Sequence, residues 1–360
     1  MKKTIAVIGG GLVGRLCAWQ LAGAGWRVSV FDQGDREGRQ AAAYIAAAML
    51  APLAEAIDAT PLVTALGRQS VARWQRLIEQ LPEPVFLQQA GSLVVWHAQD
   101  KPLARQFEQQ LKRAWGSDPA QLWQAEQLAE REPQLAGRFQ TGMYLPGEGQ
   151  LENRQVLSAL AAALEQAGVD CRWQSEITPQ QLAGQFDWLL DCRGFGAQAD
   201  WNHAAGSRLR GVRGEVVRVY APEVSLNRPV RLLHPRYPLY IAPKPNHQFV
   251  IGATQLESES GAPTSVRSGL ELFSALYAVH PAFGEAQVLE LSSGLRPTLN
   301  HHNPEIRFSR QSRMVEVNGL FRHGFMISPA VCETVVQLLQ GLADDAPLPQ
   351  AEEGLIREQG

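Results

Sequence analysis

Apolar residues near the start of the chain follow two different periods. Residues 3–8 form a short β-branched and apolar run, as a buried parallel strand requires. A glycine-rich stretch separates this run from a segment with helical spacing, and residues 28–31 then form a second apolar run. The apolar face of the helical segment consists of Leu16, Ala18, Leu21 and Ala22. The order strand, helix, strand predicts a βαβ unit with a parallel sheet.

The remainder of the chain mixes both periods. Helical spacing recurs in the segments 71–81, 103–111, 156–164, 265–278 and 331–339. Strand-like runs occupy the segments 91–96, 169–173, 186–192, 214–220, 230–233, 239–242, 248–253, 288–291 and 314–317. Turn residues separate the runs between 214 and 253 at hairpin-like intervals, which indicates an antiparallel sheet. The run 186–192 ends in a glycine turn at 194–196, which indicates a return to the first parallel unit.

Three glycines between the first strand and the helix have the spacing Gly-x-Gly-x-x-Gly. Gly9 permits a tight turn, Gly11 lets the backbone approach a pyrophosphate, and Gly14 lets the helix pack closely on the strand. The free N–H groups at the start of the helix favour phosphate there. Asp32 ends the second strand, where a carboxylate accepts hydrogen bonds from both adenosine ribose hydroxyls and repels a 2′-phosphate. This order predicts a dinucleotide site; the alternative is a glycine-rich turn in an ordinary α/β domain.

The segment 36–60 is rich in small residues and allows two interpretations. Alanine has the highest helix propensity, so the segment is compatible with an ordinary helix. Small side chains at Ala47 and Ala48, next to Met49, would also let the backbone crowd against a bulky ligand. The second interpretation is favoured because the segment follows Asp32 directly.

Composition and charge narrow the class of protein. A chain of 360 residues can bury a sizeable core and is long enough for two domains. It is 45% hydrophobic and 19% charged, with a net charge of −3 and no long run of one sign, so we expect no nucleic-acid surface. No run of 18 apolar residues and no signal-like start occur, so we expect no membrane span and a cytoplasmic location.

Cysteine and histidine patterns give no indication of a metal site. The cysteines are scattered, without a CxxC pair, so buried free thiols are expected in a reducing compartment. They are Cys17, Cys171, Cys192 and Cys332. His301 and His302 lack a second pair at ligand spacing and are interpreted as loop residues.

Over nearly its whole length the chain resembles the D-amino-acid oxidase family of FAD flavoproteins. The resemblance rests on the unit 9–32, on Ala47–Leu50, and on the motif Pro238–Lys244. It continues through three motifs that are more specific than the glycine loop, at 250–254, 294–297 and 321–325. Within the family, the chain is most similar to the glycine oxidase branch associated with thiamine biosynthesis.

The resemblance implies an α/β fold with a Rossmann-like FAD-binding domain. It also implies a discontinuous α+β substrate domain built on the antiparallel sheet. We expect residues 1–80, 150–212 and 292–360 in the FAD-binding domain, and 81–149 and 213–291 in the substrate domain.

Roles for individual residues also follow from the resemblance. Arg296 would pair bidentately with the substrate carboxylate, Tyr240 would hydrogen-bond the same group, and Arg322 would lie near the substrate or the flavin edge. The backbone of residues 324–326 would stabilise negative charge at the flavin N1–C2=O end. The implied cofactor contacts are Gly9, Gly11, Gly14, Asp32, Ala47, Ala48, Met49, Gly194, Arg296, His323, Gly324, Phe325 and Met326. The alternative is that Arg296 and Arg322 form surface ion pairs and that Tyr240 belongs to the sheet core.

Three positions depart from the family pattern. His323 stands where several relatives have a small residue or asparagine, and Cys192–Gly194 replaces a Gly-Thr or Gly-Ala turn. Sarcosine oxidases of the family attach flavin to a cysteine shortly after the Leu-Arg-Pro motif. Here Thr298, Leu299 and Asn300 follow Pro297, so the expected cofactor is non-covalent FAD.

The resemblance implies oxidation of glycine or another small amine or D-amino acid. The expected co-substrate is molecular oxygen, the expected products are hydrogen peroxide and an imine or glyoxylate, and thiazole synthase is a candidate partner. Self-association is left open. The alternatives are an amino-acid dehydrogenase with another electron acceptor, a tRNA-modifying flavin domain, and a non-catalytic flavoprotein. Neither the net acidity nor the lack of a fused partner domain favours the tRNA-modifying alternative, and the set Tyr240, Arg296 and Arg322 argues against the non-catalytic one.

Overall fold

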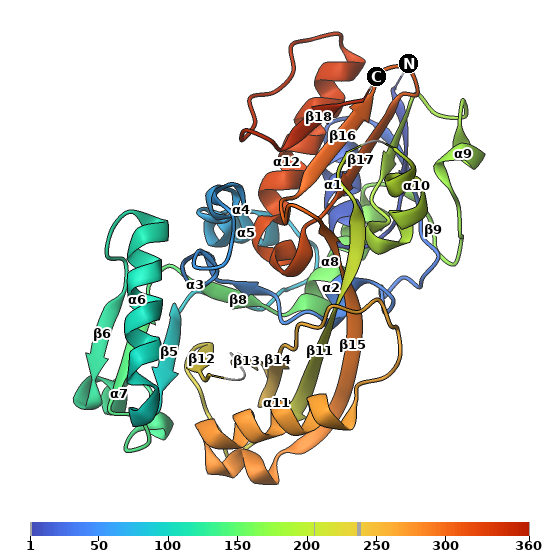
Figure 1. Cartoon of the computed structure of the whole chain (residues 1–360). Coiled ribbons are helices and arrows are strands. Elements are labelled where there is room, and N and C mark those ends of the chain that lie inside the picture. The colour runs from blue at the N-terminus through green and yellow to red at the C-terminus, as the bar shows by residue number, and fades with distance from the viewer. Residues whose placement is uncertain (1, 205, 236–238, 360) are drawn as a thin grey trace.

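The computed structural model describes residues 2–204, 206–235 and 239–359, and these residues form three sheets (Figure 1). Pro238, the first residue of the motif Pro238–Lys244, lies outside the described residues. Figure 1 shows both termini at one end of the molecule, beside the seven-stranded sheet, and helix α11 at the other end, below the eight-stranded sheet. The predicted α/β fold with a parallel and an antiparallel part is confirmed.

The seven-stranded sheet has the order β18-β16-β17-β10-β1-β2-β9. Strand β1 pairs in parallel with β2 on one side and with β10 on the other, so the predicted βαβ unit and the return at 186–192 are both present. Its strands are Thr4–Ile8 (β1), Arg27–Phe31 (β2), Asp170–Arg172 (β9), Trp188–Asp191 (β10), Glu305–Ser309 (β16), Met314–Asn318 (β17) and Ile356–Glu358 (β18). Because helices cover both faces, Ile5, Ala6 and Val7 are fully buried, which accounts for the continuous apolar run.

Three helices complete the core of this part. Helix α1 (Leu12–Gly23) packs between α8 (Asn153–Gln166) and α12 (Gly324–Ala343). Helix α12 is long and apolar enough to cross a membrane by composition, but 78% of its most apolar window is buried inside the structure. It is therefore a core helix of this domain, and the cytoplasmic location stays a prediction.

The eight-stranded sheet has the order β15-β11-β14-β13-β12-β5-β7-β6. Its strands are Ser92–Trp96 (β5), Gln121–Gln124 (β6), Thr141–Leu145 (β7), Leu209–Tyr220 (β11), Val230–Leu233 (β12), Leu239–Lys244 (β13), Gln248–Gly252 (β14) and Gln287–Leu299 (β15). Helix α11 (Val266–Val279) packs on β11, β13 and β14, while α6 (Lys101–Trp115) and α7 (Ala125–Arg131) lie at the other end (Figure 1). Strands β11 to β14, which cover the predicted antiparallel region 214–253, pair antiparallel as predicted, and β12 pairs in parallel with β5 outside that region.

A small third sheet joins the two larger ones. It consists of Met49–Leu50 (β3), Gly149–Leu151 (β8) and Leu87–Gln88 (β4). The short helices around it are Ala42–Ile45 (α2), Pro52–Glu55 (α3), Pro61–Gly67 (α4) and Ser70–Ile78 (α5), and Pro179–Leu182 (α9) and Gln198–His203 (α10) lie on the seven-stranded part. The helical segment predicted at 71–81 corresponds to α5, which ends three residues earlier.

The predicted domain boundaries near residues 212 and 292 fall within two paired strands. β11 and β15 run antiparallel from Leu209 opposite Leu299 to Tyr220 opposite Gln287, without a break at either boundary. Figure 1 shows this ribbon extending from the eight-stranded sheet into the part that contains the seven-stranded sheet. The division into domains stays a prediction. The paired strands β11 and β15 connect the two predicted domains without interruption.

The cysteines and the histidine pair lie largely where the sequence predicted them. Cys17, Cys192 and Cys332 are buried free thiols as predicted, whereas Cys171 is partly exposed because it lies on the edge strand β9. His301 and His302 lie in a turn as predicted. Among the described residues no group of three or more His, Cys, Asp or Glu side chains is arranged to hold a metal ion.

Candidate active site

The glycine loop between β1 and α1 has the geometry that its sequence predicted. Gly9 has a φ of +101°, and a side chain there would collide with the backbone carbonyl of Cys192 at 2.6 Å. A methyl group on Gly14 would lie only 1.8 Å from the carbonyl oxygen of Gly9. At Gly11, by contrast, the nearest atom would be the Cβ of Ala41 at 3.8 Å. The loop is therefore packed tightly on its inner side and open at Gly11, where a ligand would approach.

Asp32 closes the loop at the end of β2. Its Oδ2 accepts a hydrogen bond from the backbone N–H of Gly10 at 2.5 Å, and its Oδ1 accepts one from Gly34 at 2.7 Å. Each carboxylate oxygen retains a second lone pair, so acceptance of hydrogen bonds from ribose hydroxyls is compatible with these contacts. The contact of Asp32 with ribose stays a prediction.

Arg15 is a fully buried residue of α1 that the sequence interpretation missed. Its guanidinium donates to the carbonyl oxygens of Gly10 at 2.6 Å, Leu157 at 2.6 Å and Arg36 at 2.8 Å. Burial lowers its pKa to about 10. Arg15 thus holds the glycine loop in place through its hydrogen bond to Gly10. Nothing in the sequence around a single helical arginine indicates that it is buried.

Residues 42–49 form a strap across the space between the two larger sheets. Only Ala42–Ile45 is helical; Ala46 to Ala48 are not helical, and Ala48 has a φ of +53°. Lys244 of β13 donates to the carbonyl oxygen of Ala47 at 2.8 Å and so holds the strap against the sheet. Within the segment 36–60 the helical alternative holds for Ala42–Ile45 and Pro52–Glu55, and the contact of Ala47 and Ala48 with a bulky ligand stays a prediction.

A cavity of about 490 Å³ lies between the strap, the ribbon of β11 and β15, and the start of α12. Eleven of the predicted site residues line it: Ala47, Ala48, Met49, Gly194, Tyr240, Arg296, Arg322, His323, Gly324, Phe325 and Met326. Gly9, Gly11, Gly14 and Asp32 do not line it. Since Leu12 and Val13 at the start of α1 are part of its lining, the cavity begins where the glycine loop ends.

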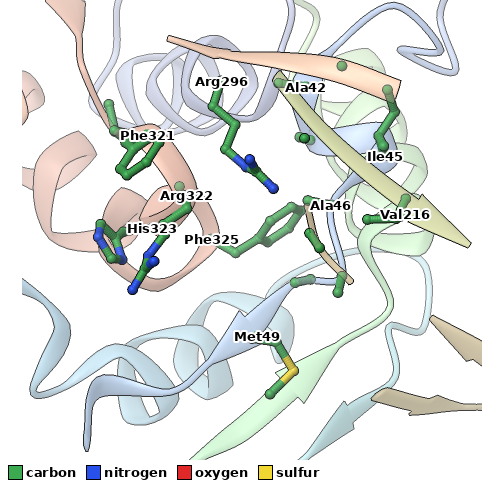
Figure 2. A pocket seen from close by; sticks show the side chains of 18 of the residues that line it. Ala42, Ile45, Ala46, Met49, Val216, Arg296, Phe321, Arg322, His323 and Phe325 are labelled. Atoms are coloured by element: carbon green, nitrogen blue, oxygen red, sulfur yellow. The ribbon is translucent and has the colours of Figure 1, made fainter. Parts of the chain in front are cut away.

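Arg296 enters the cavity from β15 (Figure 2). Its guanidinium lies against Gly214 of β11, where a methyl group would come within 2.2 Å of its Cζ. Its Nη1 donates to the carbonyl oxygens of Thr254 at 3.1 Å and Arg213 at 3.4 Å. Among the described residues, no carboxylate lies within ion-pair distance of Arg296, and neither its Nε nor its Nη2 has a hydrogen-bond acceptor. Burial lowers its pKa, so the cavity contains a desolvated and uncompensated positive charge.

Tyr240 stands beside Arg296 on the cavity wall. It belongs to β13, opposite Gly252 of β14, and a side chain at Gly252 would collide with the Tyr240 hydroxyl at 2.6 Å. Burial raises the pKa of Tyr240, with the nearby charge of Arg296 opposing that effect. A protonated phenol can donate a hydrogen bond to a carboxylate. The structure thus brings together the two residues for which the resemblance implied carboxylate binding.

Arg322 lies in a different electrostatic environment. Its Nε is 2.8 Å from Glu55 Oε2, and its Nη2 donates to Asp58 Oδ2 at 3.1 Å. Glu55 Oε1 in turn accepts a hydrogen bond from Arg231 of β12 at 2.8 Å. Burial alone would raise the pKa of Glu55. The positive charges of Arg322 and Arg231 together have a larger, opposite effect and hold the pKa of Glu55 well below its usual range. The sequence interpretation missed Glu55, Asp58 and Arg231, which carry no motif or periodic signal.

His323 lies next to Arg322 (Figure 2). It is buried, and its Nδ1 is 3.4 Å from Glu55 Oε2. Burial lowers the pKa of His323 to about 4, against the effect of Glu55, so its imidazole is neutral at pH 7. The group of Glu55, Asp58, Arg231 and Arg322 therefore has no net formal charge, and we refer to these four residues as the paired cluster.

Helix α12 begins at Gly324, directly after these residues, and points its first turn at the cavity. No side chain caps this terminus. The indole Nε1 of Trp74 donates to the Phe325 carbonyl oxygen at 2.6 Å and fixes the first turn from the outer side. Free backbone N–H groups of a long helix favour negative charge, as the predicted contact with a flavin requires.

These features fit an FAD molecule. The open face at Gly11 and the start of α1 suit the pyrophosphate, and Asp32 suits the ribose. The cavity beyond Val13 is bounded by small or apolar residues of the strap and by the start of α12, which suits a flavin ring.

Comparisons with known proteins agree with this geometry. A family model described as FAD dependent oxidoreductase (DAO) matches residues 4–338. The putative thiamine biosynthesis oxidoreductase ThiO of Rhizobium etli is 39% identical over 93% of this chain and 96% of its own length. Glycine oxidase of Geobacillus kaustophilus is 28% identical over 93% and 92% of the two chains. A crystal structure of glycine oxidase from that species, 23% identical, covers 98% of this chain and 100% of its own with a TM-score of 0.81.

A longer relative contains this type of chain as one part. The bifunctional protein ThiO/ThiG of Trichormus variabilis is 24% identical over 94% of this chain but only 53% of its own length. The full-length match of the family model and the 39% identity to ThiO decide the assignment. The chain belongs to the DAO family of FAD-dependent oxidoreductases and is of the glycine oxidase and ThiO type.

Proposed function

We propose that this protein oxidises glycine, or another small amine or D-amino acid, with the substrate carboxylate bound by Arg296. The observation that carries this proposal is the uncompensated guanidinium of Arg296 beside Tyr240 on the wall of the cavity. A buried positive charge without a partner attracts an anion, and a planar guanidinium suits a carboxylate bidentately.

When bound, FAD would accept a hydride from the substrate Cα and pass the electrons to molecular oxygen, which becomes hydrogen peroxide. Arg296 and Tyr240 fix the carboxylate and thereby place the Cα–H bond. The substrate reacts as the neutral amine, and the imine that forms is hydrolysed by water to glyoxylate and ammonia when the substrate is glycine. We propose no side chain as a general base: burial lowers the pKa of His323 to about 4, which makes it a weak proton acceptor, and Glu55 is engaged by two arginines.

An oxygen-uptake assay with glycine, sarcosine and small D-amino acids tests this function. Hydrogen peroxide formed in stoichiometric amount, with air as the only acceptor, supports an oxidase. Substrate-dependent reduction of a quinone or dye without peroxide would instead support an amino-acid dehydrogenase.

The cofactor is proposed to be non-covalent. Thr298, Leu299 and Asn300 follow Pro297, and none of them is a cysteine. Acid precipitation should therefore release all flavin into the supernatant. Flavin that remains with the protein pellet would contradict this proposal.

Asp32 is proposed to bind the adenosine ribose. Asp32→Ala removes the acceptor of two hydroxyl groups, so FAD affinity should fall about tenfold or more at roughly 1.5–3 kcal/mol for hydrogen bonds to a charged group. Titration of the apoprotein with FAD measures this change, and an unchanged affinity would remove Asp32 from the cofactor site.

The similarity to ThiO and to a ThiO/ThiG protein supports a role in supplying the thiazole branch of thiamine synthesis. Thiazole synthase is then the proposed consumer of the imine product. Co-purification of the two proteins, or faster thiazole formation when both are present, measures this link.

A further inference from the structure

Two more arginines line the cavity besides Arg296, and Glu55 contacts both. Arg231 comes from β12 and Arg322 from the residues before α12, so two elements far apart in the sequence contribute them. One carboxylate oxygen of Glu55 accepts from Arg231, and the other lies 2.8 Å from Arg322. The Glu55 side chain is 17% exposed, and its contacts are these two guanidinium groups and His323.

The charges in the cavity are thus arranged in two separate groups. Arg296 provides one positive charge that is free to bind a carboxylate. The paired cluster has two positive and two negative charges, and its more exposed acid, Asp58, is 58% exposed and screened by water. Glu271 of α11 also lines the cavity and is not among the ion-pair partners of these arginines. Glu55 is the acid of the paired cluster that contacts both arginines, and it is less exposed than Asp58.

Without the charge of Glu55, the lining of the cavity would carry further guanidinium groups able to attract an anion. Arg231 and Arg322 are both on the lining, and charge effects connect Arg322 and Glu55 to Arg296. A ligand with its first carboxylate on Arg296 and a second carboxylate one or two carbons away would then be attracted by Arg322. With Glu55 ionised, Arg231 and Arg322 already have an acid partner, so a second carboxylate would have to displace Glu55 or lie beside its like charge.

We propose that Glu55 determines the charge specificity of the cavity. Together with Asp58 it neutralises Arg231 and Arg322, so the site accepts small amino acids with one carboxylate at Arg296 and rejects those whose side chain carries a second. This inference rests on the proposed function, because it requires that Arg296 binds the first carboxylate. According to this inference, the part of the cavity next to Arg231 and Arg322 accepts only neutral substrate side chains.

The test uses the FAD-loaded enzyme and two inhibitors, acetate and malonate, whose binding is followed by the flavin absorption spectrum. In the parent, malonate should bind more weakly than acetate. Glu55→Gln keeps the shape and the acceptor oxygen but removes the charge, so malonate affinity should rise about tenfold or more relative to acetate affinity. Asp58→Asn is the matched control: it removes the exposed partner of Arg322, and the ratio should change by less than about threefold because water screens that pair.

A second variant tests the same idea from the other side and does not depend on the folding of Glu55→Gln. Arg322→Met leaves the Glu55 charge with one partner fewer, so malonate should weaken further relative to acetate. In the double variant Glu55→Gln/Arg322→Met, the gain in malonate affinity should be lost. An unchanged ratio of malonate to acetate affinity in either single variant would overturn the inference.

These outcomes are distinguishable from failure of the proposed function itself. If Arg296→Ala still binds acetate as the parent does, the carboxylate site is elsewhere and the proposed function loses its basis. If Arg296→Ala loses acetate while Glu55→Gln leaves the ratio unchanged, only the role of Glu55 is wrong.

Discussion

Arg296 and Arg322 line the same cavity, and yet they differ in almost every physical respect. Arg296 sits on a long, regular strand, and its hydrogen-bond partners are backbone carbonyl groups. Arg322 sits in a short turn before α12 and is paired with Glu55 and Asp58. Burial lowers the pKa of Arg296, whereas the charge of Glu55 raises the pKa of Arg322. Both arginines belong to motifs that predicted a role at the site, but their surroundings give them different abilities to bind an anion.

In the proposed function, charge compensation, more than position, decides which arginine binds the substrate. A carboxylate that reaches Arg296 gains a partner that has no other acid to satisfy it. A carboxylate that reaches Arg322 must compete with Glu55, which is already desolvated and close. Breaking such an established pair leaves a buried charge unpaired, which costs about 3–5 kcal/mol.

The largest expected effect follows from removing the uncompensated charge. Arg296→Ala should weaken acetate binding by about 30-fold or more, because loss of a desolvated charge partner costs on the order of 2–5 kcal/mol. FAD content should stay near that of the parent, since the residues proposed to contact the phosphates and ribose do not line the cavity. The measurement is acetate titration of the flavin spectrum, with FAD content as the control.

A stability measurement tests the protonation of a buried acid close to Glu55. Glu148 is buried behind Glu55, where it accepts hydrogen bonds from the Ala54 backbone N–H and the Ser92 hydroxyl. Burial raises its pKa to about 7, against the effect of those hydrogen bonds. The native state then holds a proton that the unfolded chain releases near pH 4.5, so stability falls as the pH rises from about 4.5 to 7 and is constant above it.

Glu148→Gln should remove this loss, which is up to about 3 kcal/mol for a shift of this size. Thermal unfolding of parent and variant between pH 4.5 and 8 measures it, with the exposed substitution Glu333→Gln as the control. Parallel curves for parent and Glu148→Gln would mean that Glu148 is ionised in the folded protein.

A conservative substitution separates the effect of the planar guanidinium of Arg296 from the effect of its positive charge. Arg296→Lys keeps one positive charge but loses the planar fork, so acetate should bind more weakly than in the parent and more tightly than in Arg296→Ala. Turnover with glycine should fall more than acetate affinity, because the Cα–H bond is placed by the bidentate contact. Equal turnover in Arg296→Lys and the parent would show that charge alone is sufficient.

The smallest effect is expected at the paired arginine. Arg322→Ala should change acetate affinity by less than about tenfold, or 1.4 kcal/mol, because the charge of Arg322 is already compensated. If Arg322→Ala lost as much acetate affinity as Arg296→Ala, the claim that charge compensation prevents Arg322 from binding an anion would be wrong.

The sequence predicted the parts of this structure that depend on local pattern. The strand, the glycines and Asp32 follow one another without insertion, and their geometry is decided by backbone space and alternation alone. Arg296 and Tyr240 could be located because motifs carry them. Strands β16 and β18 were not predicted: Glu305 and Arg307 are charged residues of β16 that pair with each other inside the fold, which interrupts the apolar pattern.

The residues that sequence reasoning missed at the site are those whose role arises from long-range contacts. Glu55 meets Arg231 and Arg322 across 176 and 267 positions of the chain, and nothing near Glu55 signals these partners. Arg15 is similar, since its acceptors come from three separate segments. A charged residue in isolation is usually solvent-exposed, and only the tertiary structure shows that Arg15 is buried against backbone carbonyl groups and that Glu55 is paired with two arginines.

A crystal structure of the FAD-loaded enzyme with acetate tests the central claim most directly. The account predicts that both acetate oxygens lie within hydrogen-bond distance, about 2.7–3.0 Å, of the Arg296 guanidinium, with the Tyr240 hydroxyl as a further donor. It also predicts that Glu55 remains paired with Arg231 and Arg322. An acetate bound to Arg322, with Glu55 displaced and Arg296 without an anion, would contradict the account.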